Sequence, residues 1–165
     1  MGSGKSVIGR NLSKAISYTF YDLDNFITTK EGLTINEIFE QKKEIYFRKI
    51  EREYLKELIN KDEEKVISLG GGTPCYDNNM EIILNTVDSD SIYIHRSISF
   101  LVDRLYNKIY SRPLIAHLKS KEELKEFISK HLFERNQYYL RSKKILKTDN
   151  SELDQVTQEL IGVLG

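Results

Sequence analysis

The chain of 165 residues is long enough to bury a core of its own as one domain, and its 39% hydrophobic and 30% charged residues are ordinary for a soluble globular protein. Its 25 Lys and Arg residues balance 25 Asp and Glu residues, so no overall charge favours a nucleic acid or a membrane as partner. The single cysteine excludes an internal disulfide, and the sequence shows neither a signal-peptide pattern nor an apolar run of about 18 residues, so we expect a cytoplasmic protein.

Short β-like runs alternate with longer helical runs along the chain, and this alternation is typical of a layered α/β domain. Hydrophobic periodicity predicts helices over about 5–16, 34–40, 45–59, 100–105, 121–139 and 153–164. Strands are predicted at about 18–21, 66–69, 92–94 and 145–146. Thr34 and Glu37 have the spacing of a capping box at the start of the second helix.

The chain opens with GSGKS at residues 2–6, and a helical pattern follows at once. This is the second half of the P-loop motif G-x-x-x-x-G-K-[ST], whose glycines let backbone N–H groups and a helix N-terminus face phosphates. Lys5 would reach the β- and γ-phosphates of ATP, and the Ser6 hydroxyl would bind Mg²⁺. The alternative is a Gly/Ser-rich tail, but the helical stripe and Gly9 behind the motif favour the P-loop.

The first glycine of a complete motif would lie two residues before Met1, and the buried strand that normally leads into a P-loop is missing from the sequence. In this fold that strand would occupy the middle of the sheet. We expect the natural polypeptide to have upstream residues that supply both, with Met1 an internal methionine or a miscalled start. A protein that began at Met1 would be expected to fold poorly or to be inactive.

Asp22 and Asp24 follow the strand predicted at 18–21, and ligands of parallel sheets bind at that edge. Side chains two positions apart on a strand point the same way, so both carboxylates would serve one site. Asp22 is suited to hold Mg²⁺, and Asp24 is suited to accept a hydrogen bond, and the proton, from an acceptor hydroxyl. An ordinary strand-end turn is the alternative, and the P-loop motif nearby favours the site.

Arg48 and Glu51 are three residues apart on one helical face, and Arg135 lies late in the longest predicted helix. Most such residues form solvated surface pairs. Arginine nevertheless offers the planar, bidentate donors that fit a carboxylate, so both arginines are candidate clamps for a carboxylated acceptor. The three glycines at 70–72 would let a small ligand approach the backbone closely, with a tight turn as the alternative.

Arg112 and Pro113 lie in an irregular stretch at about 107–120. A mobile loop with an arginine is typical of a lid that excludes water and adds positive charge at the phosphates. An ordinary surface loop is the alternative. Cys75 is interpreted as a structural or incidental residue, because no His or second Cys lies near it in sequence.

Taken in order, these motifs resemble the shikimate kinase family over nearly the whole chain. The resemblance is carried by residues 2–6, 22–24, 38–40, 47–51, 69–74, 112–114, 134–135 and Tyr139. The sequence departs from the family at Lys43-Glu44, where the family usually has Gly-Glu. The resemblance implies an α/β P-loop fold of three layers, with a parallel five-stranded sheet flanked by helices and related to the nucleoside monophosphate kinases. The first central strand of that sheet is missing from the given sequence.

The resemblance also implies a function: one domain over 1–165 that uses ATP and Mg²⁺ to phosphorylate the 3-hydroxyl of shikimate in aromatic amino-acid biosynthesis. A helical segment at about 24–60 would bind the acceptor, and the lid would span about 107–120. The residues implied to bind ATP are Gly2, Ser3, Gly4, Lys5, Ser6, Val7 and Arg112, with Lys5, Asp24 and Arg112 catalytic and Mg²⁺ on Ser6 and Asp22. Those implied to bind shikimate are Asp24, Arg48, Gly70, Gly71, Gly72 and Arg135.

Two other functions stay open at this point. One is another P-loop small-molecule kinase, acting on gluconate or a nucleotide, although the glycines with the two arginines favour a small carboxylated polyol over a base. The other is a non-catalytic nucleotide-binding module. In each case we expect a monomer whose partners are small molecules, with no nucleic acid and no membrane.

Overall fold

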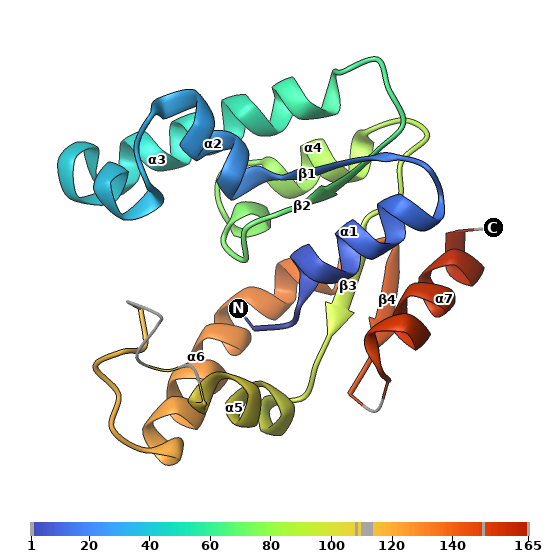
Figure 1. The fold of residues 1–165 in the computed structure, drawn as a ribbon. Coiled ribbons are helices and arrows are strands. Elements are labelled where there is room, and N and C mark those ends of the chain that lie inside the picture. Colours follow the sequence, from blue (N-terminus) through green and yellow to red (C-terminus); the bar gives the residue numbers. More distant parts are fainter. Residues whose placement is uncertain (1, 108, 110–113, 150, 165) are drawn as a thin grey trace.

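Helices and parallel strands alternate along the computed structural model of the chain, which describes residues 2–107, 109, 114–149 and 151–164 (Figure 1). In chain order the elements are α1 (Lys5–Ala15), β1 (Thr19–Asp22), α2 (Leu23–Glu31), α3 (Ile35–Ile59), β2 (Lys65–Ser68), the short 3₁₀ helix η1 (Thr73–Cys75), α4 (Asn79–Asn85), β3 (Ile92–His95), α5 (Ile98–Tyr106), α6 (Lys121–Tyr139), β4 (Lys144–Lys147) and α7 (Leu153–Leu164). Every helix and strand predicted from periodicity is present to within a few residues, whereas α2, α4 and η1 were not predicted. No helix in the described residues is both long and apolar enough to cross a bilayer.

The strands of the described residues form two parallel pairs. β1 lies beside β2 with Thr19 opposite Lys65, and β3 lies beside β4 with Ile92 opposite Lys144. Parallel neighbours need a long crossover, which α2 and α3 supply for the first pair and α5 and α6 for the second. The α/β class with parallel strands is therefore confirmed. The four strands of the described residues lie in two separate pairs, and not in the single five-stranded sheet that the resemblance implied.

Helices α1 and α7 pack against both strand pairs. Four of their side chains form one buried cluster: Ile8, Leu12, Val156 and Leu160. Apolar side chains from both pairs pack against this cluster, among them Val66 of β2 and Ile94 of β3. Figure 1 accordingly shows α1 lying between the two pairs. Because α1 begins at the P-loop motif, this packing fixes the motif relative to both pairs.

Asp22 ends β1 and begins α2. Its carboxylate accepts a hydrogen bond from the Asn25 N–H at 3.4 Å, as the N-cap of the helix. Asp24 therefore lies in the first turn of a helix, and the strand geometry predicted for the two carboxylates is wrong. The helix escaped prediction because Leu23 and Ile27 are its only buried residues, too short a stripe to show a helical period.

α3 begins with the predicted capping box and breaks at Lys43. The Glu37 N–H donates to Thr34 Oγ1 at 3.3 Å, and the Thr34 N–H donates to Glu37 Oε2 at 2.7 Å. Lys43 has φ 69° and ψ 169°, a backbone conformation that essentially only glycine adopts without strain. The break confirms the predicted junction between two successive helices. The lysine that replaces the family's glycine there is strained.

Replacing Lys43 with glycine should stabilise the fold, because glycine reaches this conformation without a Cβ clash. We expect Lys43→Gly to raise the free energy of unfolding by about 1 kcal/mol, measured by urea denaturation. The matched control is Lys43→Ala, which removes the same long side chain but keeps Cβ and should give no gain. Equal stabilisation by both variants would contradict strain in the backbone as the cause.

The Glu31 carboxylate at the end of α2 accepts three hydrogen bonds from α3. The donors are Tyr54 Oη at 2.7 Å, Tyr46 Oη at 2.8 Å and Lys42 Nζ at 2.9 Å. These contacts lower the pKa of Glu31 to about 2, with the Tyr54 hydroxyl contributing most. The bond to Glu31 in turn raises the pKa of Tyr54 to about 12. Ionised Glu31 thus fastens α2 to α3 on both sides of the break at Lys43.

Glu31→Gln should lower the free energy of unfolding at neutral pH by about 2 kcal/mol, the range of hydrogen bonds to a charged group. The folded pKa of about 2 lies below the ordinary value of 4.5. This stabilisation is therefore present above the ordinary pKa and is lost as the pH falls toward the folded one, so the wild-type advantage should shrink across that window in urea denaturation.

The control for Glu31 is Glu57→Gln, because the exposed pair of Glu57 with Lys30 also joins α3 to α2, at 2.7 Å. This variant should change stability little at any pH. A wild-type advantage over Glu31→Gln that stayed constant into acid would contradict the ionic role of Glu31.

Candidate active site

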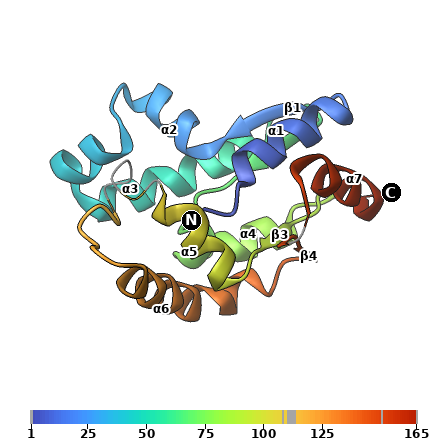
Figure 2. The same ribbon diagram turned by 60° about the horizontal axis from the view of Figure 1, so that its bottom comes forward.

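The backbone of residues 2–6 forms a loop at the N-terminus of α1. Gly2 (φ 78°) and Gly4 (φ 89°) both adopt the left-handed region that favours glycine. Gly4 caps α1 without a side-chain hydrogen bond, which leaves the first N–H groups of the helix to an anion. Helix α5 lies next to the loop (Figure 2): a Cβ on Gly2 would stand 3.0 Å from Leu105 Cδ1, and one on Gly4 would stand 3.3 Å from the Arg104 guanidinium. The loop therefore suits phosphates and has a further cation beside it.

Ser6 and Asp22, the two predicted magnesium ligands, are in contact. Ser6 Oγ donates to Asp22 Oδ2 at 2.6 Å and lies 3.4 Å from Ser68 Oγ. These three residues belong to α1 and to the C-terminal ends of β1 and β2. A hydroxyl and a carboxylate are the hard oxygen ligands that suit Mg²⁺, whose other ligands in kinases are phosphate oxygens and water. The pair fits the expected ion.

The half-buried carboxylate of Asp24 is the point on which the separate motifs converge. Burial is the main cause that raises its pKa, and the charge of Lys5 opposes that rise, while Asp22 raises the pKa further and Arg48 lowers it. Asp24 Oδ1 also lies 3.1 Å from the position of a Cβ on Gly70. A carboxylate with a raised pKa is a stronger base toward an acceptor hydroxyl.

Arg48 belongs to a buried network and is not a solvated surface residue. Its Nη1 donates to Glu51 Oε2 at 2.8 Å, and the Glu51 side chain is only 1% exposed. Thr73 Oγ1 donates to the other oxygen of Glu51 at 2.7 Å. A Cβ on Gly72 would stand 2.9 Å from Arg48 Nη1, so a side chain there would displace the guanidinium. The glycine is required by this close approach and not by a turn alone.

Arg135 and Tyr139 of α6 reach the same region. Tyr139 Oη donates to the Gly71 carbonyl. Burial first, and Cys75 next, raise the pKa of Tyr139 to about 12, whereas Arg135 lowers it. Burial raises the pKa of the Cys75 thiol, and Arg135 and Arg48 both lower it. The two predicted clamp arginines, from α3 and α6, therefore meet around η1.

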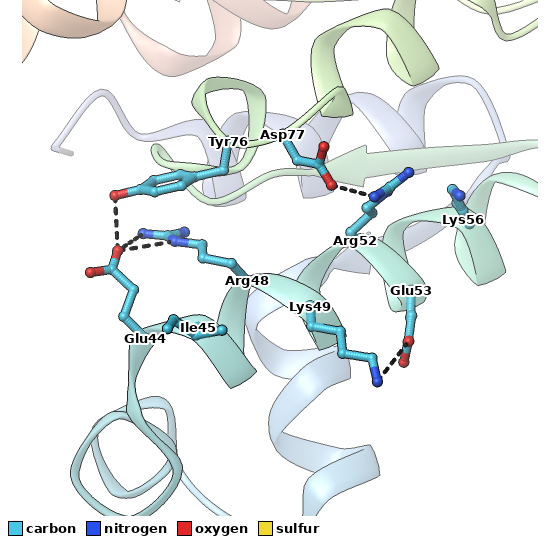
Figure 3. Close-up of a pocket in the computed structure, with 9 residues that line it drawn as sticks. All are labelled: Glu44, Ile45, Arg48, Lys49, Arg52, Glu53, Lys56, Tyr76 and Asp77. Atoms are coloured by element: carbon cyan, nitrogen blue, oxygen red, sulfur yellow. Dashed lines mark hydrogen bonds and ion pairs between the residues drawn. The ribbon is translucent and has the colours of Figure 1, made fainter.

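An open groove of about 800 Å³ lies beside Arg48, between α3 and the residues that follow η1 (Figure 3). It is lined by Glu44, Ile45, Arg48, Lys49, Arg52, Glu53, Lys56, Tyr76 and Asp77. Most of its charges are paired with one another: Arg48 with Glu44, Arg52 with Asp77 and Lys49 with Glu53. The groove shares Arg48 with the site around η1, but Asp24, the glycines and Arg135 do not line it.

The structure thus brings most of the predicted site residues together: Lys5, Ser6, Asp22, Asp24, Arg48, the glycines at 70–72 and Arg135. Arg112 lies outside the described residues. Within the predicted lid at about 107–120, Ile109 (4% exposed) and Ile115 (0%) are buried in a cluster with residues of α5 and α6.

Sequence reasoning did not include Glu51, Tyr76, Tyr139 or Glu44 among the site residues. Glu51 had a signal, the spacing of three from Arg48, but the sequence did not reveal that the pair is buried. Tyr76 stacks on Arg48, with the guanidinium carbon 3.7 Å from the ring centre, and only its place after the glycines pointed to it. Tyr139 was noted as part of a family motif, with no role assigned.

The comparisons with known proteins agree with this geometry. A family model described as shikimate kinase matches residues 1–164. A shikimate kinase of Flavobacterium johnsoniae is 46% identical over 164 residues, which are 99% of this chain and 94% of that protein. The crystal structure of a shikimate kinase from Bacteroides thetaiotaomicron has a TM-score of 0.87 at 30% identity, over 99% of this chain and 93% of that one.

A shikimate kinase from Acinetobacter baumannii, solved in complex with shikimate, has a TM-score of 0.85 at 26% identity and covers 99% of this chain and 88% of that one. The family match covers residues 1–164 and therefore includes all the candidate site residues. These matches also confirm the resemblance seen in the order of the motifs. The chain belongs to the shikimate kinase family.

Proposed function

We propose that the chain transfers the γ-phosphoryl group of ATP to the 3-hydroxyl of shikimate. The observation that carries this proposal is the position of Asp24 between the two halves of the site. Its neighbour Asp22 accepts a hydrogen bond from Ser6 of α1 at 2.6 Å, and Asp24 Oδ1 lies 3.1 Å from where a Cβ on Gly70 would stand, in the glycine triplet that Arg48 approaches. An acceptor hydroxyl has to lie between a phosphate site and the clamp that holds the rest of the acceptor. The likeness to a relative solved with shikimate supports this choice of acceptor.

The phosphate-binding loop and α1 would hold the nucleotide. Residues 2–7 supply backbone N–H groups and the helix N-terminus, and Lys5 adds a fixed positive charge. Ser6 and Asp22 would hold Mg²⁺, which neutralises charge on the phosphates when bound. Arg112 would add a further cation from the lid.

The residues around η1 would hold the acceptor. Arg48 and Arg135 would bind its carboxylate, and the glycines at 70–72 would let its ring lie against the backbone. Asp24 would orient the hydroxyl and take its proton as the oxygen attacks phosphorus. The contribution of the protein is then positioning and charge neutralisation, with no covalent intermediate. We further propose that the chain acts as a cytoplasmic monomer.

An ADP-release assay with three acceptors tests this function. Shikimate should support ADP release, whereas gluconate and nucleoside monophosphates should not. Turnover with gluconate in place of shikimate would favour the other P-loop kinase. No ADP release with any acceptor would favour the nucleotide-binding module.

Arg48→Lys should raise the KM for shikimate by about 10- to 100-fold and leave the KM for ATP nearly unchanged, because lysine cannot make the bidentate contact. Lysine keeps a cation beside the buried Glu51 and so protects the fold. The matched control is Arg52→Lys, one turn further along α3, whose partner is Asp77. Equal changes in both KM values would contradict the assigned role of Arg48.

Lys5→Ala should lower kcat by about 10²- to 10³-fold, because a fixed charge near the transferring phosphoryl group is lost. Steady-state rates at saturating shikimate measure this change. Lys14→Ala is the control, since it removes a lysine from the last turn of the same helix. Unchanged turnover in Lys5→Ala would exclude its role at the phosphates.

A further inference from the structure

The Glu44 carboxylate lies on the arginine proposed to bind the acceptor. Glu44 Oε1 accepts hydrogen bonds from Arg48 Nε and Nη2, both at 3.3 Å, and from Tyr76 Oη at 2.8 Å (Figure 3). These contacts lower the pKa of Glu44, with Tyr76 contributing most, and the charge of Arg135 lowers it further. The carboxylate therefore interacts with both proposed clamp arginines.

The hydrogen bond to Glu51 leaves the Nε/Nη2 edge of Arg48 free for another partner. Nη1 donates to Glu51 at 2.8 Å, and the guanidinium fills the space where a Cβ on Gly72 would stand. One face is stacked on the Tyr76 ring. An incoming carboxylate that binds side-on needs two parallel N–H donors, and Nε and Nη2 are such a pair. Glu44 occupies this edge with a single oxygen.

Glu44 is not needed to hold Arg48 in place. Glu51 is 1% exposed and lies 2.8 Å from Nη1, whereas the Glu44 side chain is 52% exposed and its two contacts are longer. Exposed ion pairs are weak because water competes for both charges. The buried partner fixes the guanidinium, and the exposed one only covers its free edge.

Glu44 also has room to leave. It lines the open groove of about 800 Å³ beside α3. It directly follows Lys43, where the helix is broken. Its side chain can therefore turn away from Arg48 without moving a buried group.

We propose that Glu44 is an internal stand-in for the acceptor's carboxylate, which covers the free edge of Arg48 in the empty enzyme and is displaced when the acceptor binds. This inference rests on the proposed role of Arg48. Glu44 then competes with the acceptor, so the charge on Glu44 weakens acceptor binding. A group that pre-orients Arg48 would have the opposite effect.

Glu44→Gln tests the competition, because glutamine keeps the shape of the side chain and can still accept from Tyr76 but carries no charge. The Kd for shikimate, measured by calorimetry, and the KM for shikimate should both fall by about two- to fivefold. The matched control is Glu53→Gln, an exposed acid of the same helix and groove whose partner is Lys49, at 4.0 Å. It should leave both constants unchanged.

The methyl ester of shikimate separates competition from a general change in the site. It has no carboxylate to compete with Glu44, so Glu44→Gln should leave its affinity unchanged. An unchanged or raised Kd for shikimate in Glu44→Gln would overturn the inference. So would an equal gain in affinity for the ester.

Arg48→Lys distinguishes failure of this inference from failure of the proposed site. If that variant raises the KM for shikimate while Glu44→Gln does not lower it, the proposed acceptor site at Arg48 is supported and the proposed role of Glu44 is contradicted. If Arg48→Lys leaves the KM for shikimate unchanged, the proposed acceptor site falls as well.

Discussion

The buried carboxylate of Glu51 is the constraint on which the proposed acceptor site depends. A carboxylate that is 1% exposed is strongly disfavoured unless its charge is paired and its oxygens accept hydrogen bonds. Arg48 and Thr73 meet that need, one on each oxygen. This single group thereby fixes the clamp arginine of α3 against the loop that carries the glycines. The absence of a side chain at Gly72 is part of the same arrangement, since the guanidinium fills that space.

The two halves of the site are held together by elements that lie far apart in the chain. Helix α1 carries the phosphate-binding loop and packs on side chains from both strand pairs. The contact of Ser6 with Asp22 ties that helix to the end of β1, where α2 and the acceptor residues begin. Helix packing and this hydrogen bond therefore help to set the position of Lys5 relative to Arg48.

Local signals in the sequence were enough to predict much of the fold and the site. The capping box at Thr34 depends on neighbouring residues only, and the P-loop glycines are required by backbone conformation wherever the motif occurs. Contacts between distant residues were not predictable. Tyr54 bonds to Glu31 across 23 positions, and Tyr139 reaches Gly71 across 68, and neither spacing leaves a periodic pattern. The strand geometry predicted for Asp22 and Asp24 was wrong. The two carboxylates are still neighbours, because Asp22 is the N-cap of α2 and Asp24 lies in its first turn.

The stacking of Tyr76 on Arg48 has a stereochemical consequence. The Tyr76 ring covers one face of the guanidinium at 3.7 Å, and the Phe47 ring centre lies 5.0 Å from the guanidinium carbon, so an edge-on approach in the plane of the guanidinium is favoured. A carboxylate bound there lies in that plane, and the ring attached to it loses the freedom to tumble about the arginine. The acceptor's carboxylate, and not the hydroxyl that reacts, would then determine which hydroxyl of the ring faces the phosphoryl group. The regiochemistry of the proposed reaction would then depend on the groups that surround the Arg48 guanidinium.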